Sequence, residues 1–337
     1  MTIIRQRLIA ALAAAAILLT ACGGGGSSST PASNPDPDQG GPIRGITGTG
    51  FAIGSITGFG SVIVNGVTYD TDAATFTRDG VAATQSDFSV GQFVIVSGTI
   101  DDSTSGTAET VIFDDNVEGP VTSVDDVARS VVIHRQTVLV SAPTSFDDSC
   151  PDTLEGLLAV AAVEVSGPVR ADGSIEATRV DCKAIAGELE VMGIVSDLDT
   201  MAMTFKINAL VVDYGTTPAV LDNFPSAGVI NNGDPVEAKG NAVDANGQLV
   251  ATRVEYKGGQ FANDDGVHAE IEGFITRCGS TTDFDVSGIP VTTTGTTIYE
   301  GGASGDLGLN LKVEVEGEFD ANGVLVATKV EFKQGTN

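Results

Sequence analysis

The sequence predicts an all-β protein built from four tandem, small antiparallel β-barrels of five to six strands each. Composition is the first reason: the chain is rich in Val, Ile, Thr and Gly, aromatic residues make up 5% and Trp is absent, which favours strands joined by tight turns. The second reason is a closing segment that recurs along the 337 residues. Its copies are Gly173-Ser-Ile-Glu-Ala-Thr-Arg-Val180, Gly247-Gln-Leu-Val-Ala-Thr-Arg-Val254, Gly323-Val-Leu-Val-Ala-Thr-Lys-Val330 and, more weakly, Gly106-Thr-Ala-Glu-Thr-Val111.

Residues 1–21 have the pattern of a bacterial lipoprotein signal peptide. Arg5 and Arg7 precede an apolar run that is too short for a comfortable membrane span but suits a signal sequence. The segment Leu19-Thr20-Ala21-Cys22 resembles the lipobox, in which lipid is attached to the cysteine sulfur before cleavage ahead of that residue. The resemblance predicts lipidation of Cys22 and attachment to a bilayer, to which each buried methylene contributes about 0.8 kcal/mol.

Residues 22–46 are rich in Gly, Ser, Pro and Asp and are predicted to form a flexible tether. Gly23 follows the cysteine, where an Asp would resemble an inner-membrane retention signal. The outer membrane is therefore the expected location, with both the periplasmic and the surface-facing orientation open. An ordinary secretory signal with a cysteine at its cleavage site is the alternative.

Each copy opens with a glycine and an alternating apolar segment, followed by further strand-like segments. The fourth segment ends in a Val-x-Val-x-Gly pattern, and the fifth carries the closing signature. Three dipeptides fit tight hairpins between these two segments: Asp172-Gly173, Asn246-Gly247 and Asn322-Gly323. The copies are predicted to span residues 47–116, 117–186, 187–258 and 267–333.

A chain of about 65 residues in five strands can cover its own edges by rolling into a small barrel. A sandwich that spans two copies is the alternative. The openings at Gly54, Gly119, Gly193 and Gly273 are unevenly spaced, which favours units with their own cores over a strict solenoid.

The stretch Gly50-Phe-Ala-Ile-Gly-Ser-Ile-Thr-Gly-Phe-Gly-Ser-Val-Ile-Val-Asn-Gly66 and the repeated Val-Glu-Val-x-Gly…Ala-Thr-Arg-Val-Glu pattern carry a family resemblance. They resemble a tandem domain-of-unknown-function family of proteobacterial lipoproteins, over roughly residues 47–333. The resemblance implies small barrels similar to OB-folds. It implies no catalytic residues, because the matching motifs are turns and strand cores.

The net charge of −28, which becomes −30 when Arg5 and Arg7 are removed, excludes most anionic partners. A surface of this sign repels phosphate backbones and anionic lipids, so no nucleic acid is expected as a partner. The simplest explanation of this charge is that it keeps an envelope protein soluble. Divalent cations and basic or neutral partners remain open.

Cys150 and Cys182 fall in the same copy, and in an oxidising envelope they are a disulfide candidate. Cys278 is left over, either as a buried apolar residue or as a partner for one of the other two. A zinc site is disfavoured, because no Cys-x-x-Cys spacing occurs and no His lies near a cysteine pair. No metal-ligand residue is therefore assigned.

The only two histidines, His134 and His268, are expected in a strand and in an exposed inter-copy linker, and no Gly-x-Ser-x-Gly elbow accompanies them. The glycine-rich segments lack the phosphate-loop motifs, so no cofactor is expected. The sequence thus predicts a protein without catalytic residues.

Five adjacent carboxylate pairs are interpreted as solvated turns: Asp101-Asp102, Asp114-Asp115, Asp125-Asp126, Asp147-Asp148 and Asp264-Asp265. Calcium binding is the sharper alternative, although no segment has the Asp-x-Asp-x-Asp-Gly spacing.

The first functional hypothesis is a non-enzymatic, lipid-anchored scaffold or spacer of the cell envelope that binds a polymer or protein partner through several copies. The alternative is an oligosaccharide- or peptide-binding lipoprotein in which one barrel has a polar or aromatic cleft that the others lack.

Overall fold

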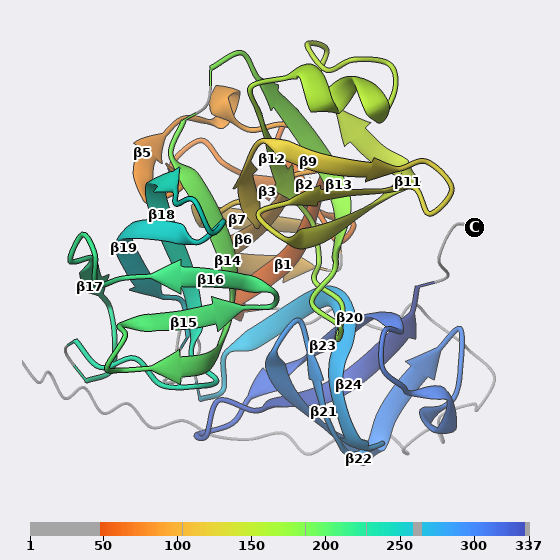
Figure 1. Cartoon of the computed structure of the whole chain (residues 1–337). Helices are drawn as coiled ribbons and strands as arrows, with labels where there is room; N and C mark the ends of the chain where they lie inside the picture. Colours follow the sequence, from red (N-terminus) through yellow and green to blue (C-terminus); the bar gives the residue numbers. More distant parts are fainter. Residues whose placement is uncertain (1–47, 103, 186, 227, 259–264, 334–337) are drawn as a thin grey trace, which may run out of the picture. The chain divides into compact units, whose positions relative to one another are not determined.

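The computed structural model describes residues 48–102, 104–185, 187–226, 228–258 and 265–333. Apart from three short 3-10 helices, the regular elements of these residues are β-strands (Figure 1). The predicted all-β class is confirmed. The predicted signal peptide and tether, with Cys22, lie outside the described residues. The described part of the chain includes no helix whose length and apolar character would allow it to cross a membrane.

The strands follow one another in four sets, which we call copies 1 to 4. Copy 1 comprises β1 (Gly48–Gly58), β2 (Val62–Val64), β3 (Val67–Asp70), β4 (Thr75–Arg78), β5 (Val81–Ala83), η1 (Gln85–Asp87), β6 (Phe93–Asp102) and β7 (Ser105–Phe113). Copy 2 comprises β8 (Val117–Gly119), β9 (Val121–Asp125), β10 (Ser130–Ile133), β11 (Gln136–Phe146), η2 (Glu155–Ala159), β12 (Ala162–Ser166) and β13 (Ile175–Lys183).

Copies 3 and 4 have similar strand orders. Copy 3 comprises β14 (Leu189–Asp199), β15 (Thr204–Ile207), β16 (Leu210–Asp213), β17 (Val220–Asp222), β18 (Pro235–Val243) and β19 (Leu249–Tyr256). Copy 4 comprises β20 (His268–Ser280), β21 (Asp283–Val286), β22 (Ile289–Glu300), η3 (Ser304–Asp306), β23 (Lys312–Phe319) and β24 (Leu325–Phe332).

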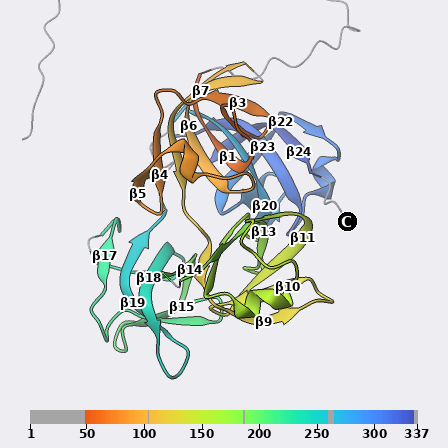
Figure 2. The same cartoon turned by 90° about the horizontal axis from the view of Figure 1, so that it is seen from above.

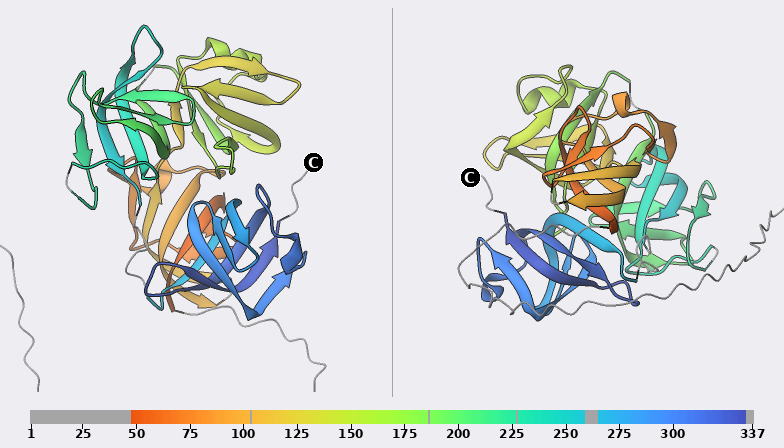
Figure 3. Two further views of the ribbon diagram at one scale, coloured as in Figure 1. Left: turned by 60° about the horizontal axis from the view of Figure 1, so that its bottom comes forward. Right: turned by 180° about the vertical axis from the view of Figure 1, so that it is seen from behind.

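Strand pairing within each copy is barrel-like. In copy 4, β20 pairs with β21, β21 with β22, β22 in parallel with β24, β24 with β23, and β23 with β20 again. Figure 3 shows these blue strands curving around one another. The other copies have the same cycle, with the first strand of copy 2 interrupted at Pro120. Each copy contains a parallel pair, so the expectation of purely antiparallel barrels is wrong. In such a closed cycle each of the five strands has a neighbour on both sides, so few strand edges stay open.

The opening glycine of each copy makes room for the hairpin between the second and third strands. A Cβ on Gly54 would lie 1.9 Å from Asn65 Oδ1, and a Cβ on Gly273 would lie 1.9 Å from Ser287 Oγ. The equivalent contacts are Gly119 with His134 and Gly193 with Ile207. These side chains sit at or beside the hairpin turn, so any larger residue in the first strand would displace it.

The glycine that ends the Val-x-Val-x-Gly pattern marks a bulge against the last strand. A Cβ on Gly240 would lie 2.3 Å from the carbonyl oxygen of Val250, and one on Gly317 would lie 2.3 Å from that of Val326. The register shifts at both positions. The repeated glycine is thus explained by close approach of two backbones.

The predicted Asn-Gly hairpins join β18 to β19 and β23 to β24. Gly247 and Gly323 have φ angles of 77° and 74°, and each amide N–H donates to the carbonyl three residues earlier. Asp172-Gly173 forms the same turn in a longer connection between β12 and β13. Turns are therefore found at all three dipeptides where the sequence predicts them.

The buried apolar residues form three clusters instead of the four separate cores expected from the uneven spacing. One cluster is formed within copy 1. A second is formed by copy 4 together with Ile53, Phe93 and Ile95 of copy 1. The third runs without a break through copies 2 and 3, from Val117 to Val254. The expectation that every copy has its own core is therefore wrong for copies 2 and 3.

The first strands of the copies pair with one another, which explains the merged cores. In copies 1 and 4, β1 and β20 run in parallel, with Ala52 opposite Glu270 (Figures 1 and 2). In copies 2 and 3, β8 and β14 run antiparallel, with Val117 opposite Val191. Two twelve-stranded sheets result, one from copies 1 and 4 and one from copies 2 and 3.

The substitution Gly317→Ala should lower the free energy of unfolding of copy 4 by about 2–3 kcal/mol, because the new methyl group overlaps the Val326 carbonyl. Gly295→Ala, in the same copy but with no atom within 4 Å of the added Cβ, is the control and should change stability by less than about 0.5 kcal/mol. Chemical denaturation measures both. Equal effects would show that the bulge tolerates a side chain.

Glu270 makes stability depend on pH. Burial, and after it the charge of Glu314, raises the pKa of Glu270 to about 9. The charged or titratable groups that face it are Glu314, Glu316, Lys329, Lys333 and Tyr69. The folded protein therefore holds a proton that the unfolded chain releases above its ordinary pKa of 4.5, so stability is lost as pH rises between about 4.5 and 9.

Glu270→Gln removes this titration. It should stabilise the protein by on the order of 2 kcal/mol at pH 8, and this gain should disappear near pH 4. Thermal unfolding at several pH values measures the difference. A gain that does not depend on pH would contradict the assignment.

Candidate functional site

A row of charged side chains crosses the sheet of copies 2 and 3. Each residue is the cross-strand partner of the next: Lys239 on β18, Glu190 on β14, Glu118 on β8, Glu164 on β12 and Asp181 on β13. Alternation points these residues away from the barrel cores. They are nevertheless buried or half-buried, because copies 1, 2 and 3 meet over this face.

Basic side chains from several strands neutralise part of this row. Glu164, only 3% exposed, binds Arg78 of copy 1 and Lys183 of copy 2, the latter at 2.7 Å. Lys239 lies 2.6 Å from Glu190. We call the whole set the junction network, and it comprises Arg78, Asp79, Asp114, Asp115, Glu118, Glu164, Lys183, Glu190, Glu237, Lys239, Glu255 and Lys257.

Asp115 lies at the centre of the network in the connection from β7 to β8. Its amide N–H donates to Asp79 Oδ1 at 3.2 Å, and the next residue, Asn116, is held by backbone hydrogen bonds to Val165 and Met192. These hydrogen bonds hold the backbone at Asp115 and Asn116. Asp115 is 1% exposed, and neither carboxylate oxygen has a hydrogen-bond partner among the described residues.

The surroundings of Asp115 are acidic. Burial, followed by the charges of Glu190 and Asp79, raises its pKa well above the usual range. Burial also raises the pKa of Glu190 to about 7, although Lys239 acts in the opposite direction. An unpaired buried carboxylate costs free energy unless a proton or a cation neutralises it.

Two triads of carboxylates share Asp115. Oxygen atoms of Asp79, Asp115 and Glu190 lie within 4.8 Å of one another, and so do those of Asp115, Glu118 and Glu164. A third triad, Glu270, Glu314 and Glu316, lies in copy 4 and is matched by Lys329 and Lys333. Such oxygen clusters have the chemistry that hard divalent cations require.

A polar cleft with a volume of about 650 Å³ opens beside the network, between copies 1 and 2. Copy 1 contributes the β4–β5 hairpin, including Arg78, Asp79 and Ala82, and copy 2 contributes Arg179, Asp181 and Lys183 from β13. Its size falls in the range of small-ligand sites. Charges of both signs line it, so it suits a polar ligand more than an apolar one.

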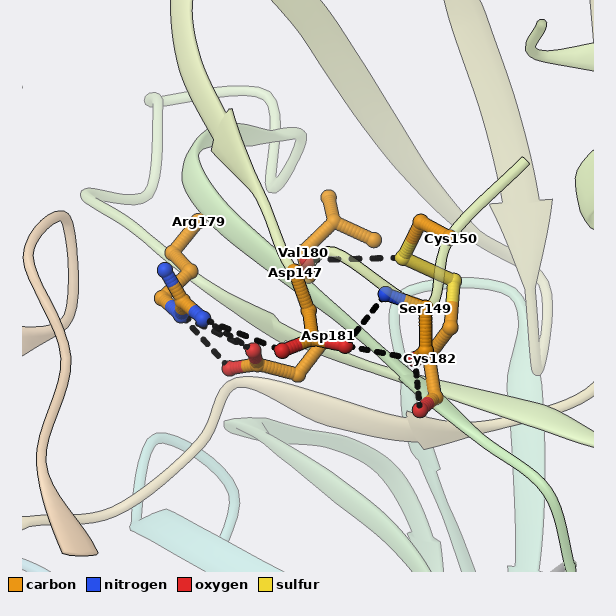
Figure 4. Close-up of a disulfide and its surroundings, with 7 residues drawn as sticks. All are labelled: Asp147, Ser149, Cys150, Arg179, Val180, Asp181 and Cys182. Carbon is orange, nitrogen blue, oxygen red and sulfur yellow. Dashed lines mark hydrogen bonds and ion pairs between the residues drawn. A yellow bond between two sulfur atoms is a disulfide. The ribbon is translucent and has the colours of Figure 1, made fainter. Parts of the chain in front are cut away.

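Figure 4 shows the disulfide of Cys150 and Cys182 with its neighbours Arg179 and Asp181. Cys182, Arg179 and Asp181 all line the cleft. Nearby, Arg179 binds the Asp181 carboxylate at 2.8 and 2.9 Å and donates to the Val90 carbonyl of copy 1 at 3.1 Å. The two cysteines are 32 residues apart, and closing such a loop contributes about 3–4 kcal/mol on the chain-entropy model.

The third cysteine and the two histidines that the sequence analysis considered pack within the fold. Cys278 is a free, half-buried thiol that packs against the core of copy 4. His134 is buried in the β10–β11 turn, where its Nε2 lies 3.1 Å from the Glu118 carbonyl and burial lowers its pKa. His268 was expected in an exposed linker, but it begins β20 and is half-buried, because β20 starts earlier than the pattern indicated.

The interpretation of Asp114-Asp115 as a solvated turn is wrong, because the connection between copies 1 and 2 is covered by both copies and by copy 3. Asp101, Asp102, Asp125, Asp126 and Asp265 are exposed, and Asp264 lies outside the described residues.

The sequence analysis missed the glutamates of the junction. The available signal was a Glu at alternate positions of the first and fourth strands, as in Glu270 and Glu272 of β20 and Glu314 and Glu316 of β23. Period-two alternation alone would place such residues on the solvent face of a single barrel. Only the pairing of first strands between copies turns that face inward.

Comparison with known proteins agrees with the four copies. No functionally characterised protein matches the chain. The model of the domain of unknown function DUF5666 matches residues 42–111, 118–181, 192–255 and 272–331. These matches cover most of the chain and one falls in each copy, so the protein belongs to the DUF5666 family and carries four of its domains in tandem.

Proposed function

We propose that the protein is a non-enzymatic, lipid-anchored outer-membrane protein whose four OB-like barrels form one binding scaffold for an envelope polymer or protein. The observation that supports this most is the strand pairing between first strands, which joins copy 1 to copy 4 and copy 2 to copy 3. Such pairing fixes the distance between the two copies of each pair. A partner that contacts several copies then gains avidity without further ordering of the protein.

The OB-like assignment rests on the cycle of strand pairings in each copy. Five strand positions close on themselves in each copy, with the third and fifth in parallel, and five strands are the number that an OB-fold has. The Cys150–Cys182 disulfide supports a location outside the reducing cytosol.

The lipid anchor is tested by Cys22→Ser. The variant should move from the membrane pellet to the soluble fraction, because it lacks the only thiol in the lipobox-like segment. Cys278→Ser, a substitution of the half-buried thiol in copy 4, is the control and should stay in the pellet. Retention of Cys22→Ser in the pellet would contradict lipid anchoring.

The cleft favours a second candidate function, the binding of an oligosaccharide or peptide at one site. Its walls come from the β4–β5 hairpin of copy 1, which the strand order of the other copies lacks, and from β13 of copy 2. The site is therefore specific to the junction of copies 1 and 2. Arg179 and Lys183 offer donors to hydroxyl or carboxylate groups of a ligand, and Asp87 and Asp147 offer acceptors.

Ala82→Trp should abolish such binding, because Ala82 is exposed in the cleft and an indole would fill part of it. The control is Met201→Trp, at a side chain that is 95% exposed in the β14–β15 turn of copy 3. Calorimetric titration with soluble cell-wall fragments that carry both sugar and peptide measures the effect. Equal binding by the two variants would exclude the cleft as the site.

A further inference from the structure

We propose that Asp79, Asp115 and Glu190 form a site for a divalent cation of the calcium type, which ties copies 1 and 3 to the connection that leads into copy 2. The inference rests on the junction network and not on the function proposed above. It assigns a role to the acidic turn Asp114-Asp115, which the fold buries.

The first argument is the unsatisfied carboxylate. Asp115 is 1% exposed and both of its oxygens lack a hydrogen-bond partner within the described chain. Buried carboxylates are normally paired, hydrogen-bonded or bound to a metal. The charges around Asp115 that act most strongly on it are those of Glu190, Asp79, Glu164 and Glu237, all of the same sign.

The second argument is geometry. One oxygen each from Asp79, Asp115 and Glu190 lie within 4.8 Å of one another. Oxygen ligands of calcium at about 2.3–2.6 Å from the ion are separated by distances up to about 5 Å. A single ion can therefore contact all three, and water can complete the six to eight ligands that calcium takes.

The third argument is charge balance. Lys239 binds Oε2 of Glu190 at 2.6 Å, and Arg78 is directed to Glu164, leaving Asp79 at 3.6 Å. Lys239 also lies 3.5 Å from Glu237, but Glu237 has its own partner in Lys257 at 3.1 Å. The three carboxylates of the triad and the ammonium group of Lys239 then leave two negative charges, which one divalent cation neutralises. Asp79 has a side chain that is 23% exposed and lines the cleft, so the ion has a path from solvent.

The other two triads are less suitable. In the triad of Asp115, Glu118 and Glu164, both oxygens of Glu164 are already bound by Arg78 and Lys183. In copy 4, Glu314 and Glu316 are paired with lysines, and none of the oxygens of that triad is both buried and unpartnered. A substitution in the copy 4 triad can therefore serve as the control in the binding test.

The test is equilibrium dialysis of the purified full-length protein against calcium chloride, followed by measurement of bound calcium. The wild type should retain one more equivalent than Asp115→Asn, with half-saturation at or below about 1 mM. Asp115→Asn keeps the shape of the side chain and removes its charge, so it should fold. Glu270→Gln, in the copy 4 triad, should bind as the wild type does.

Thermal unfolding provides a second readout. Saturating calcium should raise the Tm of the wild type and of Glu270→Gln by about 3 °C or more, and should leave that of Asp115→Asn unchanged. The proposal is overturned if the wild type binds no calcium up to about 10 mM. It is equally overturned if Asp115→Asn binds as much calcium as the wild type. Failure of the cleft experiment would not affect either result.

Discussion

Pairing between the first strands of neighbouring barrels is the constraint on which the rest of the structure depends. A five-stranded barrel bends its first strand so that one part pairs with the fourth strand and another with the second. An edge of the first part is left for another chain segment, and open edges attract strands. Here β1 pairs with β20 and β8 pairs with β14, so the open edge of each first strand is covered by a strand of another copy.

Covering these edges has an electrostatic consequence. The outward positions of the paired strands hold glutamates, and assembly buries them together with their lysine and arginine partners. Paired charges tolerate burial, whereas an unpaired one is costly. In copy 4, Lys329 pairs with Glu316 and Lys333 with Glu314, and the raised pKa of Glu270 favours its protonated form. At the junction of copies 1 to 3, the carboxylate of Asp115 has no hydrogen-bond partner among the described residues, and we therefore place the proposed cation there.

Much of a single copy can be predicted from the sequence, because its rules are local. Alternation defines the strands, Asn246-Gly247 and Asn322-Gly323 define the hairpins, and the glycine of Val-x-Val-x-Gly defines the bulge. The arrangement of copies cannot be predicted in this way. Nothing in the residues around Ala52 indicates that Glu270, more than two hundred positions later, lies opposite. The burial of Asp115 and the cleft both follow from that arrangement, so they were missed.

The most direct test of this account is hydrogen exchange of the wild type and of Val191→Asp. Val191 is fully buried on β14, opposite Val117, in the core that copies 2 and 3 share. The account predicts that the charged side chain increases exchange in β12 and β13 of copy 2 as well as in copy 3, while copy 4 keeps its protection. Faster exchange confined to copy 3 would contradict it, because the copies would then be independent units.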